Sequence, residues 1–253
     1  MNKYAQIGFG VALGAALYHL YTRRQKSKPI VHTYKPLDID KLPSSPVTLL
    51  TQWKAEAEEQ FGPAEAKCMV VATSSPTEGA TARTVLLQSV DVNTGSLLFG
   101  SSATSLKAKT LEADARCEAV LRFGQRQIRV RGEAEVLFNE PETSDRLFSS
   151  LPTPIKIGLP LLDQGKPATE EMYAQLKTDV EKRMKAVADG SDPPPLRPNR
   201  YVGFRLKADS FEFYSGGHAS YINDRYLYVR PKGYFNEKSP KRAGGWEVVR
   251  LQA

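Results

Sequence analysis

Two cationic side chains of the sequence, Arg83 and Lys107, are suited to binding a phosphate dianion. Arg83 lies near the start of the β-branched stretch 81–90, and Lys107 follows the apolar stretch that ends at Ser102. A guanidinium offers a planar fork of donors and an ammonium a compact charge, and both bind phosphate when rigid elements hold them. Taken singly, such residues are more often solvated at a strand end or on a helix surface. A phosphate site therefore requires a fold that brings both together.

Few other residues have the chemistry for catalysis or metal binding. Cys68 and Cys117 lack a CxxC spacing and a neighbouring histidine, so we expect two reduced thiols and no metal site. His218 follows a Gly-Gly pair and is the only histidine beyond residue 32. A general-base role is conceivable for it, although a loop histidine is the simpler interpretation. The sequence thus identifies no catalytic side chain.

Charge is distributed unevenly along the 253 residues. The net charge is +7, and six cations precede the first acidic residue, Asp38. The rest of the chain therefore carries only about +1, which argues against a nucleic-acid-binding domain. Hydrophobic residues make up 41% and charged residues 25% of the sequence, as is typical of a globular protein.

An uncharged, apolar segment at residues 4–21 is followed directly by a basic cluster. Its length is at the short end of what spans a bilayer as a helix. Tyr18 and Tyr21 lie where interfacial aromatic residues are expected, just before Arg23 and Arg24. Because the stronger positive cluster follows the apolar segment, the pattern favours an uncleaved transmembrane anchor over a signal peptide. A removable amphipathic presequence is the rival interpretation.

The basic flank of this segment also predicts an orientation. The positive-inside rule keeps the C-terminal domain on the cytosolic or matrix side. The acid-free leader suits mitochondrial import, so we expect an anchor in the mitochondrial inner membrane with the domain facing the matrix. The cytosolic face of the outer mitochondrial or reticulum membrane is the alternative. Gly10 and Gly14 form a GxxxG pair that could pack against another helix in a membrane complex.

Composition divides the chain into three parts. We expect a membrane anchor with its basic flank at residues 1–28, a polar, proline-marked linker at 29–45, and a folded domain at 46–253. Short β-branched stretches separated by turn residues dominate the folded domain. Within residues 126–132, apolar residues alternate with arginines, which predicts a strand with one buried and one wet face. The domain is thus expected to be mostly β, a closed barrel with peripheral helices.

Helices are expected where apolar residues recur with helical spacing. The first begins at Pro46, a residue favoured in the first turn of a helix. The stretch 104–113 is predicted as a helix with Leu106 and Leu111 on its inner side. A long helix is predicted at 168–188, with an apolar stripe along it.

A series of short motifs extends over the folded domain. They are ARTVLL at 82–87, Ser105 with Lys107, RQIRVRG at 126–132, the proline-rich lead into RYVGF, FEFYSGG at 211–217 and NDR at 223–225. No single one is decisive, but their order and spacing from about residue 46 to 253 resemble the pyridoxamine 5′-phosphate oxidase family.

The resemblance implies a split β-barrel that dimerises and holds one FMN at each subunit interface. Arg83 and Lys107 would then hold the flavin phosphate, with the hydroxyl of Ser101 beside them. The other residues implied at the flavin are the backbone groups of Thr84, Val85 and Leu86, the amides of Gln127 and Gln164, the cation of Arg225, and Tyr201 in place of a family tryptophan.

Several positions depart from the family pattern. Leu106 stands where the family has another phosphate cation, and Gln88 replaces a substrate-side lysine. Charge-assisted hydrogen bonds are worth about 1.5–3 kcal/mol each, so pyridoxamine phosphate is not the expected substrate. The family's contacts to that substrate are replaced by Leu147, Leu151 and Ile155, and by Tyr221, Ile222 and Asn223 before the Asp-Arg pair.

Two functional hypotheses follow from the resemblance. In the first, the protein is an FMN-dependent oxidoreductase acting on a small molecule other than pyridoxamine phosphate. In the second, it is a non-catalytic accessory subunit of a mitochondrial membrane complex that retains the flavoprotein fold. A related split barrel that uses haem or a deazaflavin is a further alternative. Fold alone does not distinguish them.

Overall fold

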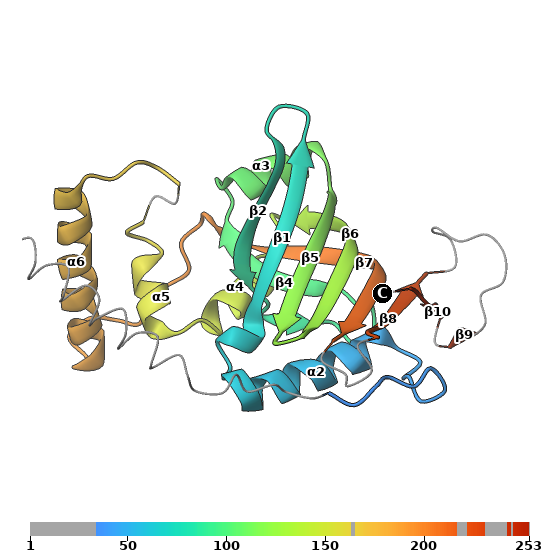
Figure 1. Cartoon of the computed structure of the whole chain (residues 1–253). Helices are drawn as coiled ribbons and strands as arrows, with labels where there is room; N and C mark the ends of the chain where they lie inside the picture. The colour runs from blue at the N-terminus through green and yellow to red at the C-terminus, as the bar shows by residue number, and fades with distance from the viewer. Residues whose placement is uncertain (1–33, 163–164, 217–221, 231–241, 244, 253) are drawn as a thin grey trace, which may run out of the picture.

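The computed structural model describes residues 34–162, 165–216, 222–230, 242–243 and 245–252 (Figure 1). The predicted membrane anchor, Gln164, His218 and Tyr221 lie outside these residues. Among the described helices, none is both long and apolar enough to cross a bilayer.

The described strands form a single antiparallel sheet. Their order is β2-β1-β5-β6-β7-β8-β10-β9, and β4 pairs with β3 and β7 off this path. The strands are β1 (Cys68–Ser75), β2 (Gly79–Leu86), β3 (Ser89–Val90), β4 (Leu97–Ser102), β5 (Arg116–Phe123), β6 (Arg126–Val136), β7 (Tyr201–Ser215), β8 (Asp224–Val229), β9 (Arg242–Ala243) and β10 (Trp246–Arg250).

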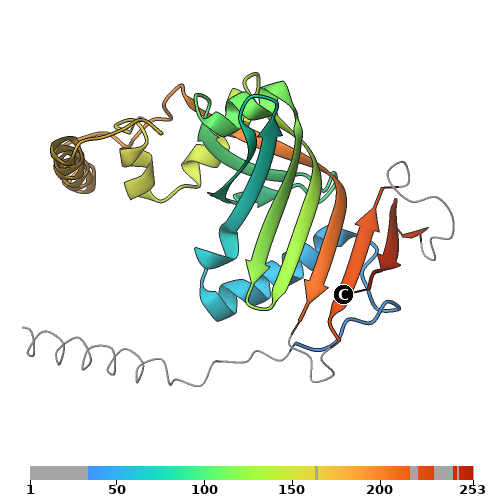
Figure 2. The same ribbon diagram turned by 45° about the horizontal axis from the view of Figure 1, so that its top comes forward.

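The long strand β7 divides its pairing between two neighbours, and this curls the sheet. Its first half pairs with β4 and its second half with β8, while β6 pairs along most of the other edge. The ladder of β6 and β7 shifts register at Arg131 and Gly132. A Cβ on Gly132 would lie 2.0 Å from the carbonyl oxygen of Lys207, so only glycine fits at this bulge. The strands form the curved, split barrel seen in Figure 2.

Aromatic residues fill the barrel. Phe99 on β4 stacks on Phe204 of β7 with 5.0 Å between ring centroids, and Phe213 meets Trp53 edge to face at 5.3 Å. All four side chains are almost fully buried. Burying such a side chain stabilises the fold by roughly 1.5–3 kcal/mol, so this layer accounts for much of the barrel's rigidity.

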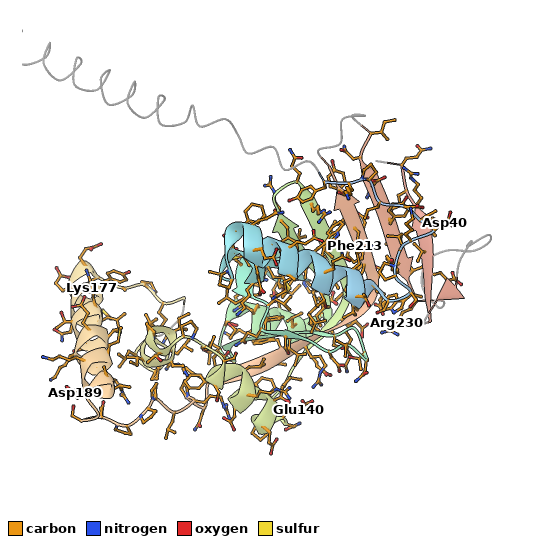
Figure 3. All side chains as sticks on the ribbon, turned by 90° about the horizontal axis from the view of Figure 1, so that it is seen from below. Asp40, Glu140, Lys177, Asp189, Phe213 and Arg230 are labelled. Atoms are coloured by element: carbon orange, nitrogen blue, oxygen red, sulfur yellow. The ribbon has the colours of Figure 1, made fainter. Side chains whose placement is uncertain are left out.

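Helices lie outside the sheet, and one of them closes the barrel. Helix α2 crosses one face and places Trp53 on the core, with Phe213 behind it (Figure 3). The helices are α2 (Pro46–Phe61), the 3₁₀ turn η1 (Glu65–Lys67), α3 (Leu106–Ala113), α4 (Pro141–Ser149), α5 (Thr153–Gly158) and α6 (Glu170–Ala188).

The described part of the predicted linker, residues 34–45, is held against the barrel. Leu37 donates its amide to the buried carboxylate of Asp224, and the hydroxyl of Tyr228 donates to the carbonyl of Pro43. The Tyr34 ring lies 3.9 Å from the Arg126 guanidinium. The chain therefore enters the folded domain before Pro46, along β8.

Helices α5 and α6 form an arm that extends away from the barrel (Figures 1 and 3). The apolar stripe predicted for the long helix is present, but none of the residues of α6 is buried. Met172 and Tyr173 are 60% and 64% exposed. The arm thus presents apolar side chains to open space beside the barrel.

Helix α3 corrects one expectation from the sequence. Leu111 is buried as predicted, but Leu106 is 42% exposed and Lys107 is 5% exposed. Ser105 caps the helix by accepting a hydrogen bond from the amide of Ala108. The cap begins the helix so that Lys107, and not Leu106, points toward the barrel.

Candidate functional site

Arg83 lies on the barrel-facing side of β2, where polar groups of β1 and β2 hold its guanidinium. It donates to the carbonyl oxygen of Val71 at 3.1 Å and to the hydroxyl of Thr73 at 2.9 Å. Its other terminal nitrogen donates to the hydroxyl of Thr81 at 2.6 Å. Arg83 lies inside the strand and not at its opening, so its position is fixed by the β1–β2 ladder.

Lys107 projects from the first turn of α3 toward the end of β4. Its Nζ donates to the hydroxyl of Ser101 at 2.6 Å. Thr110 joins α3 to β1 by donating to the hydroxyl of Thr73 at 2.9 Å, and Thr73 also accepts from Arg83. The Thr110 hydroxyl also lies 3.1 Å from the backbone carbonyl oxygen of Lys107. The predicted phosphate residues Arg83, Ser101 and Lys107 are therefore linked in one hydrogen-bonded network, the cation group.

The two cations of this group have no carboxylate partner within the part of the chain that the structure describes. Burial, together with the positive charge of Arg83, lowers the pKa of Lys107 to about 8. Burial also lowers the pKa of Arg83. Two cations held close together without an anion cost free energy, because desolvation and like charge both disfavour them. A bound dianion would offset that cost.

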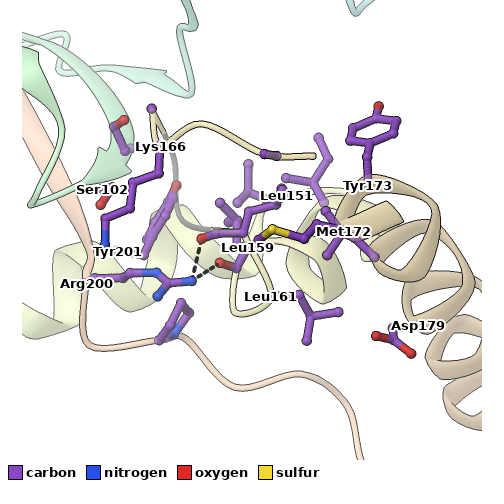
Figure 4. A pocket seen from close by; sticks show the side chains of 18 of the residues that line it. Ser102, Leu151, Leu159, Leu161, Lys166, Met172, Tyr173, Asp179, Arg200 and Tyr201 are labelled. Atoms are coloured by element: carbon purple, nitrogen blue, oxygen red, sulfur yellow. Dashed lines mark hydrogen bonds between the residues drawn. The ribbon is translucent and has the colours of Figure 1, made fainter. Parts of the chain in front are cut away.

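A large cavity begins at this group and extends to the arm. Its volume is about 1140 Å³, and Leu86, Gly100, Ser101 and Tyr201 line its barrel side. Residues of α5, α6 and the segments that flank them line the other side. Figure 4 shows Ser102, Lys166, Arg200 and Tyr201 grouped at one end, with leucines and Met172 along the opposite wall. The cavity exceeds the upper volume of about 1000 Å³ typical of small-molecule sites.

Tyr201 is fixed beside the cation group by Gln88 and Gly100. Its hydroxyl donates to the side-chain oxygen of Gln88 at 3.1 Å. The Gln88 amide donates to the carbonyl oxygen of Leu147 at 2.6 Å. A Cβ on Gly100 would lie 1.8 Å from the Tyr201 hydroxyl, so Tyr201 requires glycine at this point of β4. Gln88, just after β2, thus connects α4 to Tyr201.

Gln127 and Arg225 lie together, but in a different hollow. With Arg129, Glu212 and Tyr214 they line a space of about 220 Å³ over β6, β7 and β8. Arg225 donates to the Glu212 carboxylate at 3.0 Å. The cations of this hollow are therefore neutralised by the chain itself.

The two groups of predicted residues face opposite sides of the sheet. Arg83 pairs directly with Val71 of β1. Across the next two ladders, the residues opposite Val71 on β5 and β6 are buried in the core. Directly opposite residues share a face, and neighbours along a strand alternate. Gln127 precedes the buried Ile128 and therefore faces outward. Within a single chain, Gln127 and Arg225 therefore lie on the opposite side of the sheet from Arg83 and Lys107.

Thr84, Val85 and Leu86 lie within β2, in its ladder with β1. Among the described strands β2 is at the edge of the sheet, so its other side has no strand partner. Leu86 lines the large cavity. Gln164 lies outside the described residues. Sequence reasoning missed Thr73 and Thr81, whose hydroxyls accept from Arg83, and Thr110 of α3, whose hydroxyl donates to Thr73. The positions of Thr73 and Thr81 relative to Arg83 in β1 and β2 were the available signal.

Known proteins resemble the chain in both sequence and fold. No family model matches it. The pyridoxine/pyridoxamine 5′-phosphate oxidase of Bordetella avium is 32% identical over 211 residues, which are 82% of this chain and 89% of the relative. That of Rubrobacter xylanophilus is 29% identical over 209 residues, 82% of this chain and 86% of the relative.

Two crystal structures share the fold. PhzG from Burkholderia lata, in complex with tetrahydrophenazine-1-carboxylic acid, has a TM-score of 0.68 and 23% identity, covering 87% of this chain and all of the other. A pyridoxamine 5′-phosphate oxidase-related, FMN-binding protein from Nostoc punctiforme has a TM-score of 0.63 and 16% identity, covering 83% and 98%. The mostly antiparallel split barrel expected from the sequence is confirmed.

Proposed function

Since the chain belongs to the pyridoxine/pyridoxamine 5′-phosphate oxidase family, we propose that it binds FMN and acts as a flavin-dependent oxidoreductase on a substrate other than pyridoxamine phosphate. The observation that carries the proposal is the pair formed by the buried Lys107 and the partly buried Arg83, which has no carboxylate partner among the described residues. A phosphate dianion supplies the missing charge.

The residues of the site suit each part of FMN. Arg83, Lys107 and Ser101 would hold the phosphate, and the free edge of β2 offers backbone groups to the isoalloxazine. The adjoining cavity has room for the ring and for a substrate beside it. Bound FMN supplies hydride transfer, so the chain's own residues need only bind, orient and shield the reactants.

Removing both cations tests the proposed phosphate site. In Arg83→Ala with Lys107→Ala, FMN affinity should fall by about 100-fold or more, because two charge-assisted contacts are lost. Flavin fluorescence during titration of the full chain measures this. Arg131→Ala is the matched control, since it removes a cation that is paired with Glu118 and half-exposed. Unchanged flavin affinity in the double variant, with the fold intact, would refute the site.

We also propose that two copies of the chain share each flavin. Gln127 and Arg225 face the opposite side of the sheet from Arg83, so they reach the same flavin only from a second copy. An isologous dimer then forms two equal sites, each with the cations of one chain and the outer-face residues of the other.

Mixed dimers test this arrangement. Arg83→Ala chains and Arg225→Ala chains, carrying different affinity tags, are co-expressed and the doubly tagged dimers isolated. Each mixed dimer should retain one intact site and bind about one FMN, although either variant alone binds weakly. Failure of the mixed dimers to recover flavin would show that each site is built from a single chain.

The lining of the cavity supports a substrate other than pyridoxamine phosphate. Leu151 and Ile155 face it from the end of α4 and from α5, and neither can bind a phosphate. The amide of Gln88 is engaged with Leu147 and Ser150. Oxidation assays with pyridoxamine phosphate should give no turnover by the flavin-loaded chain, and efficient turnover would refute this part of the proposal.

The exposed arm favours a second candidate, a non-catalytic accessory subunit. None of the residues of α6 is buried in the described chain, and its apolar side chains suit a protein partner. We further propose that residues 4–21 tether the domain to a mitochondrial membrane; the support for this is the sequence of that segment alone. Full-length protein that is colourless and does not take up FMN would favour the accessory role, and a carbonate-resistant membrane fraction would support the tether.

A further inference from the structure

Five of the exposed large apolar side chains of the described residues gather in one place. Ile155, Leu161, Leu162, Met172 and Tyr173 are each at least 40% exposed, and all of them line the large cavity. Large apolar side chains on a soluble surface are usually scattered, whereas a contiguous group marks a binding site. They lie on α5, on α6 and just after α5, which places an apolar wall opposite the barrel (Figure 4).

The apolar wall is held in position by Arg200, whose hydrogen bonds are structural. One terminal nitrogen of Arg200 donates to the carbonyl oxygens of Leu159, Pro160 and Leu162 at 2.8, 2.9 and 2.5 Å. Arg200 directly precedes β7, so these bonds fasten the segment after α5 to the barrel. The leucines of this segment are thereby presented to the cavity as a defined surface.

We propose that this wall binds the substrate, and that the substrate is an uncharged, apolar molecule without a phosphate group. This inference rests on the proposed flavin site, because the cavity is continuous with Ser101 of the cation group. Arg83 and Lys107, which would bind the flavin phosphate, lie at the barrel end of the cavity. Lys166 and Arg200 lie at the same end of the cavity as Ser102 and Tyr201 (Figure 4). At the opposite wall, Leu151 and Ile155 offer no hydrogen-bond donor, so a second phosphate would lose its hydration there without compensation.

A matched pair of ligands tests the substrate class. The probes are 2-naphthol and 2-naphthyl phosphate, which differ by the phosphate, and calorimetric titrations of the full chain are made with excess FMN. We expect 2-naphthol to bind at least tenfold more tightly than 2-naphthyl phosphate. Tighter binding of the phosphate ester would overturn the proposal.

Substitutions locate the binding. Ile155→Asp should weaken 2-naphthol binding about tenfold by placing a charge in the apolar wall. Val92→Asp is the control, since Val92 is 69% exposed and lies outside the cavity. Met172→Asp gives the same test from α6 should Ile155→Asp fail to fold. Binding that is unchanged in Ile155→Asp and Met172→Asp, or equally weakened in Val92→Asp, would refute the wall as the site.

The flavin absorbance of the same samples separates the two claims. Loss of FMN with the naphthol differences preserved would refute the proposed flavin function and leave the apolar wall supported. FMN retained with no difference between Ile155→Asp and Val92→Asp would refute the wall and leave the flavin site supported.

Discussion

The cations on the two faces of the sheet differ in their partners. On the outer face, Arg129 donates to the carboxylates of Glu118 and Glu212 at 2.7 and 3.3 Å. On the barrel side, Arg83 and Lys107 contact only hydroxyls and a carbonyl. The outer cations are neutralised by the chain and stabilise it. The inner pair has no carboxylate partner among the described residues, which agrees with the proposed binding of a phosphate from outside.

Replacing a cation on each face should therefore change stability in opposite directions. Lys107→Met should raise the unfolding free energy of the flavin-free chain at pH 7 by roughly 2–3 kcal/mol, because an apolar side chain replaces a buried charge without a counter-charge. Arg129→Met should lower it by about 1 kcal/mol, since two partly exposed ion pairs are lost. Urea unfolding of the flavin-free proteins measures both. A destabilised Lys107→Met protein would contradict the comparison.

The same contrast predicts a pH dependence. The pKa of Lys107 is lowered to about 8 from its ordinary value of 10.5, so the unfolded chain binds more protons between these values. The unfolding free energy contributed by this group therefore rises with pH from about 8 to 10.5 and is constant below about 8. FMN affinity should fall over the same range as the ammonium charge is lost. Lys107→Met should lack both changes; an unaltered pH profile would assign the titration to another group.

A smaller effect is expected at Gly100, which separates the cation group from Tyr201. Gly100→Ala places a methyl against the Tyr201 hydroxyl and should cost about 1–3 kcal/mol of stability through the displaced ring. Tyr201→Phe removes only the hydrogen bond to Gln88 and should cost about 1 kcal/mol. Thermal unfolding compares the two. A Gly100→Ala protein as stable as the parent would show that Tyr201 moves freely.

The sequence was sufficient for the barrel and for its cation pair. The succession of strands and helices along the chain and the start of α2 at Pro46 follow from local patterns, and the grouping of Arg83 with Lys107 follows from the family resemblance. The wet face predicted for residues 126–132 also placed Gln127 away from the core. These features depend on alternation and spacing, which neighbouring residues encode.

Contacts between distant segments could not be predicted in this way. The hydroxyl of Tyr228 binds the carbonyl of Pro43, 185 residues away, so the predicted linker gave no sign of docking. Leu106 satisfied helical spacing as well as Lys107 did, and only the cap at Ser105 decides which one faces the barrel. Likewise, the apolar stripe predicted for the long helix does not reveal what it packs against, and none of the residues of α6 is buried in the described chain.

The most direct test compares the affinities of FMN and riboflavin, which differ only in the phosphate, for the parent chain and for Lys107→Met. If Arg83 and Lys107 exist to hold that phosphate, the parent should bind FMN about 100-fold more tightly than riboflavin. In Lys107→Met this preference should fall at least tenfold while riboflavin affinity is unchanged. Equal binding of the two flavins by the parent chain would contradict the account.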